Sequence, residues 1–96
     1  MKVYELLSDE SKWTKGARAR NRYGGELDFG EKGAKCWCLS GAICTCYPSL
    51  SKRKIILNKV YEVLYSSGKI MSITMFNDDP NTTFENVRSL CLQLDI

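Results

Sequence analysis

The chain has 96 residues, of which 44% are hydrophobic and 26% charged, with a net charge of +3 and no histidine. This length and balance predict a single folded domain over residues 1–96 rather than a disordered chain. The absence of histidine excludes Cys–His and Ser–His–Asp catalysis and histidine metal ligands. Residues 12–59 carry eleven Lys/Arg and three Asp/Glu, a net of +8, whereas residues 60–96 have a net charge of −3. Such a basic middle favours an anionic partner.

The N-terminal residues predict a short first helix of about two turns, because Val3, Leu6 and Leu7 fall at helical spacing. This region lacks the apolar middle and cleavage site of a signal peptide, and the longest aliphatic run is only Ile55 to Leu57. We therefore expect a cytoplasmic protein that does not contact a membrane. In that reducing compartment disulfides are rare, so the five cysteines should be free thiols.

Residues 15–29 predict a basic hairpin. Ala17, Ala19 and Asn21 alternate with Arg18, Arg20 and Arg22, a turn follows at Tyr23-Gly24-Gly25, and Leu27 and Phe29 alternate again. On a strand the three arginines would point the same way, about 7 Å apart. They suit an acidic protein surface, or a single nucleic-acid strand with Trp13 and Tyr23 as stacking rings. The alternative without a partner is an edge strand that arginine keeps soluble.

Residues 36–46, CWCLSGAICTC, hold four of the five cysteines. We predict a helix from about Lys35 to Cys46, with Leu39, Ile43, Cys46 and Leu50 as its buried stripe. On a helix the sulfurs diverge, so we expect small buried thiols, no metal and no cofactor. A four-thiolate zinc site is one alternative. A reactive thiol at Cys36 or Cys38, with its pKa lowered by the helix N-terminus, is another.

A third helix is predicted over residues 52–67, capped by Ser49 or Ser51 and stopped by Gly68. Its inward residues are Ile56, Val60, Val63 and Leu64. Lys52, Arg53 and Lys54 lie in its first turn, where the helix dipole disfavours positive charge, so they form a second candidate binding patch. The predicted partner-binding residues are Lys15, Arg18, Arg20, Arg22, Tyr23, Lys52, Arg53 and Lys54.

Residues 70–76 alternate and predict a short strand, and residues 77–81 predict a turn. Thr82 to Glu85 reads as a capping box that opens a last helix. Its helical stripe is Phe84, Val87, Leu90, Cys91 and Leu94. The predicted class is α+β: about four helices packed beside a small antiparallel β-hairpin or sheet.

Three stretches resemble a family of short bacterial and phage proteins of unknown function: Trp13 to Gly16, Cys38 to Ile43, and Asn77 to Pro80. Phe76 stands where that family has Trp, and Asn81 and Thr82 replace its Gly-Arg. The resemblance implies that Cys38 is the family's cysteine. Gly41 and Ala42 suit a close approach of another element to the second helix. Cys38, Asn77 and Asp78 are a candidate pocket.

We expect a small intracellular binding protein, encoded by a phage or mobile element, that engages and inhibits a host macromolecular complex through its basic face, and not an enzyme. The partner would be an anionic macromolecule, either an acidic protein surface or nucleic acid. One alternative is a nucleic-acid-binding module that uses Arg18, Arg20 and Arg22. Another is an enzyme or redox sensor that depends on Cys38.

Overall fold

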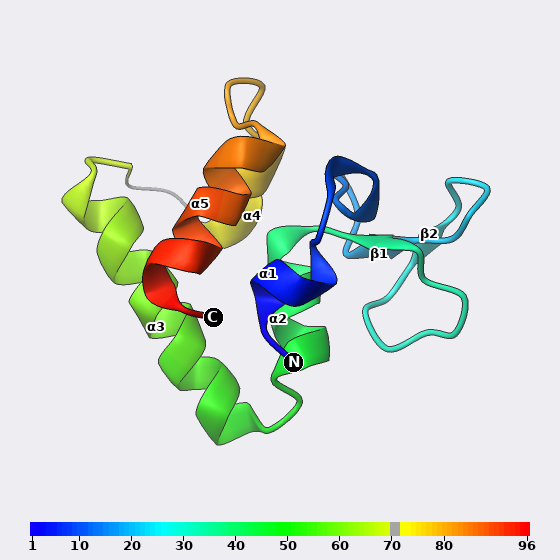
Figure 1. The fold of residues 1–96 in the computed structure, drawn as a ribbon, viewed down its shortest axis with the longest axis horizontal. Helices are drawn as coiled ribbons and strands as arrows, with labels where there is room; N and C mark the ends of the chain where they lie inside the picture. Colours follow the sequence, from blue (N-terminus) through cyan, green and yellow to red (C-terminus); the bar gives the residue numbers. More distant parts are fainter. Residues whose placement is uncertain (70–71) are drawn as a thin grey trace.

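The computed structural model describes residues 1–69 and 72–96, which form an α+β globule with five α-helices (Figure 1). The α-helices are α1 (Val3–Leu6), α2 (Leu39–Cys46), α3 (Leu50–Ser66), α4 (Ile73–Asp78) and α5 (Phe84–Leu94). A 3₁₀ helix, η1 (Glu10–Lys12), follows α1. The predicted class is confirmed, with five α-helices in place of about four. No helix in the described part of the chain is both long and apolar enough to cross a bilayer.

Three two-residue strands form the sheet, which extends to one side of the helices (Figure 1). They are β1 (Ala19–Arg20), β2 (Glu26–Leu27) and β3 (Cys36–Trp37). The central β1 pairs antiparallel with both neighbours, so that Ala19 lies opposite Leu27 on one side and Trp37 on the other. The predicted hairpin is therefore present, with much shorter strands than the alternation of residues 15–22 suggests.

The core lies among the helices. Val3 and Leu7 at the N-terminus, Leu39 and Ile43 of α2, and Val87 and Cys91 of α5 are all fully buried. From α3, the predicted inward residues Ile56, Val60 and Leu64 join this cluster, and Val63 packs at its edge. The chain ends are held together, because the amide of Val3 donates to the carbonyl of Ile96. Arg88 of α5 also donates to the carbonyls of Tyr4, Leu7 and Ser8 at the end of α1.

The second helix begins four residues later than predicted. Cys36 and Trp37 form β3, opposite Arg20 and Ala19 of β1, and Cys38 is the N-cap residue of α2. Pairing with β1 satisfies the backbone of this segment before the helix begins, and this long-range interaction outweighs the local pattern. The predicted stripe is also wrong at Leu50, which starts α3 and is 76% exposed.

The strand predicted over residues 70–76 is wrong where it can be compared. Residues 70 and 71 lie outside the described part of the chain, and residues 73–78 form the helix α4. The hydroxyl of Ser72 caps α4 by accepting from the amide of Met75 at 3.1 Å. Alternating apolar residues over so short a segment fit a strand and a short helix equally well, and the cap decides between them.

The other helix limits differ from the prediction by a few residues. The first helix has one turn rather than two, α3 begins at Leu50, and Ser49 is its N-cap residue. The capping box of α5 is shifted by one position, since Thr83 and Asn86 bond to each other's backbone amides. Gly68 ends α3 with a φ of 77°, as predicted. These differences change the ends of the helices by a few residues, and the positions of α3 and α5 in the chain agree with the prediction.

Candidate functional site

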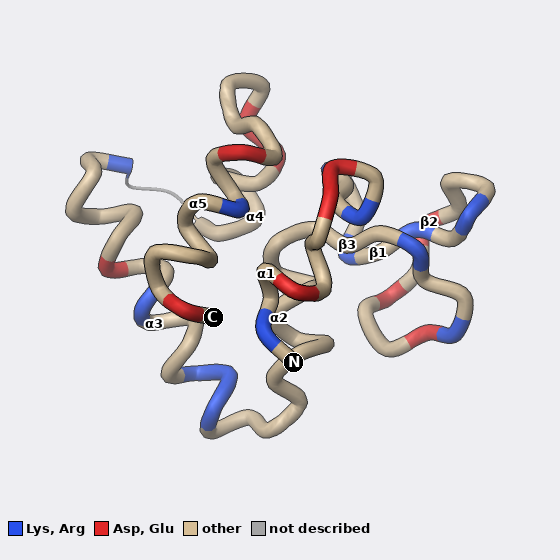
Figure 2. The backbone as a smooth tube through the Cα atoms, in the orientation of Figure 1, with Lys and Arg blue, Asp and Glu red and all other residues tan. Residues whose placement is uncertain are grey.

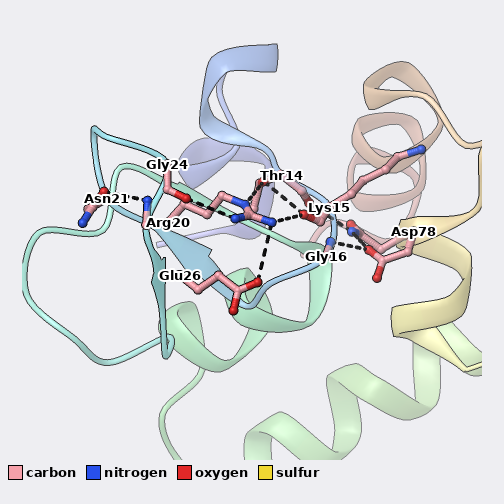
Figure 3. Close-up of polar contacts among 10 residues, drawn as sticks. Thr14, Lys15, Gly16, Arg20, Asn21, Gly24, Glu26 and Asp78 are labelled. Atoms are coloured by element: carbon pink, nitrogen blue, oxygen red, sulfur yellow. Dashed lines mark hydrogen bonds and ion pairs between the residues drawn. The ribbon is translucent and has the colours of Figure 1, made fainter.

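Arg20 is part of the framework of the hairpin. Its guanidinium donates to the hydroxyl of Thr14 and to the carbonyls of Lys15 and Gly24, at 3.0–3.1 Å, and lies 4.0 Å from Glu26 (Figure 3). The predicted row of three alternating arginines is therefore divided. Arg20 braces the base and tip of the hairpin from within, while Arg18 and Arg22 remain exposed.

The tip of the hairpin presents Arg22 and Tyr23. Tyr23 is 80% exposed, and the Arg22 guanidinium carbon lies 4.8 Å from the centre of its ring. The backbone beneath them is held by Asn21, whose side-chain oxygen accepts from the amides of Tyr23 and Gly25, both at 2.9 Å. An exposed aromatic side chain on a rigid turn loses little conformational entropy on binding. Arg22 and Tyr23 are therefore well suited to contact a partner.

Phe29 joins the two basic patches that the sequence predicts separately. The guanidinium carbons of Arg18 and Arg53 lie 5.8 and 5.5 Å from the centre of the Phe29 ring. Arg53 is held in place because it also donates to the carbonyls of Tyr47 and Pro48. We call Arg18, Phe29 and Arg53, together with Lys52 and Lys54, the exposed neighbours of Arg53 in the sequence, the basic seam. The Phe29 ring thus links the loop after β2 with the first turn of α3. Figure 2 shows the basic positions of both segments in blue.

Acidic side chains lie among these basic ones. Asp28 is 3.5 Å from Arg18, and Glu26 is 4.0 Å from Arg20. Glu31 accepts from the amide of Asp28, and acidic and basic positions are mixed around the sheet in Figure 2. Lys15, another predicted contact, donates to the carbonyl of Asp79 at 2.7 Å and lies over the Trp13 ring. The free positive charge around the hairpin is thus smaller than the composition of residues 12–59 suggests.

Asn77 connects the hairpin base to the helices. Its side-chain oxygen accepts from the indole of Trp13 at 2.6 Å and from the amide of Leu39 at 2.9 Å. Its side-chain nitrogen donates to the carbonyl of Thr14 at 3.0 Å and to Asp78 at 2.9 Å. Asn77 is fully buried, and its side chain satisfies the indole of Trp13 and the amide of Leu39. This residue of the candidate pocket is therefore part of the scaffold.

Cys38 and Asp78 do line one cavity, together with Gly16, Ala17, Arg18 and Thr74, and its volume is about 180 Å³. Asp78 accepts from the amide of Gly16 at 3.1 Å, a contact visible in Figure 3. Gly41 allows the hairpin to reach this place, because a Cβ atom there would lie 2.1 Å from the carbonyl oxygen of Arg18. The close approach to α2 predicted at Gly41 is confirmed.

The cysteines behave as packing and capping groups. Cys38 is 4% exposed, and its sulfur accepts from the amide of Gly41 at 3.2 Å. Burial raises the pKa of the Cys38 thiol, and the charge of Asp78 adds to this shift. The expectation of a lowered pKa at Cys38 is therefore wrong, because desolvation outweighs the helix terminus. Within the described residues, no group of three Cys, Asp or Glu side chains is placed to hold a metal ion.

The sequence prediction missed two residues that organise the site. The alternating pattern predicts only that Phe29 belongs to a strand, although its position among Gly and charged residues indicates a surface role. Trp13 was assigned to stacking, but it packs on Phe84 with ring centres 6.2 Å apart and bonds to Asn77. Both roles depend on residues distant in the chain, which no local pattern reveals.

Comparison with known proteins gives one match. A family model with the description "Family of unknown function (DUF6197)" matches residues 2–93. Neither a curated protein nor a solved structure matches the chain significantly. The family match covers the three stretches noted in the sequence, and it confirms the resemblance to a family of unknown function.

Proposed function

This chain belongs to DUF6197, a family of unknown function, and we propose that it is a small binding protein whose basic seam engages an acidic surface of a partner protein. The observation that carries the proposal is the convergence of Arg18 and Arg53 on Phe29. Two segments far apart in the chain thereby place a guanidinium each at the same aromatic ring, and the exposed Lys52 and Lys54 flank Arg53 in the sequence. The hairpin tip, with Arg22 and Tyr23, is a second candidate contact.

The seam is suited to recognition because its two arginines have partners that hold them before a ligand arrives. The guanidinium of Arg53 is fixed by the carbonyls of Tyr47 and Pro48. Side chains that are already ordered lose less entropy on binding. Arginine also forms paired hydrogen bonds with carboxylates, which makes it common at protein interfaces.

A protein partner fits better than a nucleic acid. Binding to a single strand depends on free aromatic rings and on a continuous positive groove. Trp13 is half-buried, Phe29 is covered by guanidinium groups, and only Tyr23 of the predicted stacking residues is exposed. Acidic residues also interrupt the positive charge around the hairpin. We extend the proposal to a cytoplasmic protein of phage or mobile-element origin that inhibits a host complex.

The test is capture of partners by the tagged full chain in its native cells, after nuclease treatment. The variant Lys52→Gln/Lys54→Gln removes two charges from the seam without removing any of its bonds, and Lys59→Gln/Lys69→Gln removes two charges elsewhere. We expect a partner that is retained by wild type and by the second variant, lost by the first, and released by salt. Loss of the bound material on nuclease treatment would instead favour the nucleic-acid function. Equal capture by both variants would contradict the proposal.

A further inference from the structure

We propose that the cavity between the hairpin base and α4 binds a small organic cation, an ammonium or guanidinium group, at the carboxylate of Asp78. Arg18 borders this cavity and also belongs to the basic seam, but the ligand proposed here has the opposite charge to the partner of the seam. The cavity is bordered by Gly16, Ala17 and Arg18 from the hairpin base, Cys38 from the start of α2, and Thr74 and Asp78 from α4. Three separate parts of the chain therefore meet around one carboxylate.

Among the residues that the structure describes, the carboxylate of Asp78 has hydrogen-bond donors but no counter-ion. It accepts from the amide of Gly16 and from the side-chain nitrogen of Asn77, and both donors are neutral. Within the described residues it takes part in none of the ion pairs, which join other residues. Asp78 is also the last residue of α4, where the helix dipole disfavours negative charge. A half-buried carboxylate in this position gains from a cation that enters the cavity.

The nearest cationic side chains are engaged elsewhere. Arg18 borders the cavity, but its guanidinium is paired with Asp28 and stacked on Phe29. Lys15, next to Gly16, donates to the carbonyl of Asp79. The side chain of Asp79 faces the turn that follows α4, where it accepts from the amide of Asn81 at 2.8 Å. The negative charge of Asp78 therefore remains available to a ligand.

The remaining walls limit the size and chemistry of that ligand. The cavity, with a volume of about 180 Å³, has room for several non-hydrogen atoms of a ligand. This is enough for a guanidinium or an alkylammonium group, whether on a free molecule or at the end of an Arg or Lys side chain. The hydroxyl of Thr74 can accept a second hydrogen bond from the cation. Cys38 and Ala17 contribute apolar walls for the attached carbon chain.

The experiment is a nitrogen-15 NMR titration of the full chain with methylguanidinium and with butylammonium chloride, at an ionic strength matched by sodium chloride. Saturable shifts are expected at the amides of Gly16, Ala17, Cys38 and Thr74. A capped tripeptide with a central arginine, titrated in parallel, distinguishes a free cation from a peptide side chain. Shifts that do not saturate, or that sodium chloride reproduces, would overturn the proposal.

Two variants remove the site in different ways. Asp78→Asn keeps an oxygen that can accept from Gly16 while removing the charge, and Ala17→Leu fills the cavity while keeping the carboxylate. Each should abolish the saturable shifts, whereas Glu62→Gln, at an exposed acid of α3, should preserve them. If Asp78→Asn does not fold, Ala17→Leu still provides the test. Unchanged shifts in a folded form of either variant would show that the cation binds elsewhere.

Discussion

The indole nitrogen of Trp13 lies 2.6 Å from the side-chain oxygen of Asn77, although 64 residues separate them in the chain. The same oxygen accepts from the amide of Leu39 at the start of α2. One buried amide thus joins the hairpin base, α2 and α4, the elements that border the cavity at Asp78. The placement of the whole candidate site relative to the helices depends on this residue.

Replacing Asn77 by alanine should lower the free energy of unfolding by about 2–4 kcal/mol, because it leaves the indole of Trp13 and the amide of Leu39 without a buried acceptor. Urea unfolding followed by circular dichroism measures the loss. Asn81→Ala, at an exposed asparagine of the same turn, is the matched control and should change stability by less than about 0.5 kcal/mol. A loss at Asn77 as small as that at Asn81 would show that its bonds do not hold the fold.

Gly41→Ala should be strongly destabilising, by about 3 kcal/mol or more, since the new methyl group would overlap the carbonyl oxygen of Arg18 and force the backbone apart. Helix propensity alone predicts the opposite, a gain of about 1 kcal/mol. Gly30→Ala is the control, because among the described residues no atom other than those of Gly30 and its chain neighbours lies within 4 Å of the added Cβ position. Thermal unfolding of both variants separates the two effects. A stabilised Gly41→Ala protein would disprove the close approach of the hairpin to α2.

Cys38 should be replaceable by serine but less easily by alanine. The sulfur caps α2 by accepting from the amide of Gly41, and a serine hydroxyl can accept the same bond. We expect Cys38→Ala to be about 1 kcal/mol less stable than Cys38→Ser in urea unfolding. If a partner binds the chain, Cys38→Ser should retain it. Loss of activity in a folded Cys38→Ser protein would instead favour the enzyme or redox-sensor alternative.

The free energy of unfolding should fall at alkaline pH because of the titration of the Cys91 thiol. Burial, with a contribution from Cys46, raises the pKa of the Cys91 thiol from 9.0 to about 12. The folded state therefore retains a proton that the unfolded state loses, so this stabilisation is complete below pH 9.0 and is lost as the pH rises to about 12. The slope between these values is at most about 1.4 kcal/mol per pH unit for one group.

Urea unfolding at a series of pH values measures this slope. Cys91→Ala should lower stability at every pH, because it leaves a cavity, and should also flatten the dependence above pH 9.0. A residual slope remains in the variant, since burial also raises the pKa values of Cys46 and Tyr47. An unchanged slope in Cys91→Ala would show that this thiol does not titrate as its burial implies.

The long elements were predictable from the sequence because their signals are local. The apolar periodicity of α3, its stop at Gly68 and the stripe of α5 from Phe84 to Leu94 all act within the helix itself. Residues 36–38 and 73–76 were assigned wrongly for a different reason. Only the pairing of Cys36 with Arg20 and the cap at Ser72 distinguish strand from helix there.

The candidate site was predictable in its residue types but not in its grouping. The arginines and lysines were identified, yet their charge alone does not indicate that Arg20 turns inward to Thr14 and Lys15. The stacking of Arg53 on Phe29 joins residues from the loop and from α3, and it follows from the packing of the whole chain. Such contacts depend on tertiary structure, and sequence patterns with short periods carry no information about them.

The most direct test of the basic seam is photo-crosslinking with a reactive phenylalanine analogue placed at single positions in the full chain. Positions 52 and 54 lie in the seam, whereas Tyr65 and Leu92 are exposed at the other end of α3 and on α5. In native cells, we predict crosslinks to one acidic protein from positions 52 and 54 and none from positions 65 and 92. Crosslinks to nucleic acid, or to the same protein from positions 65 and 92 alone, would contradict the account.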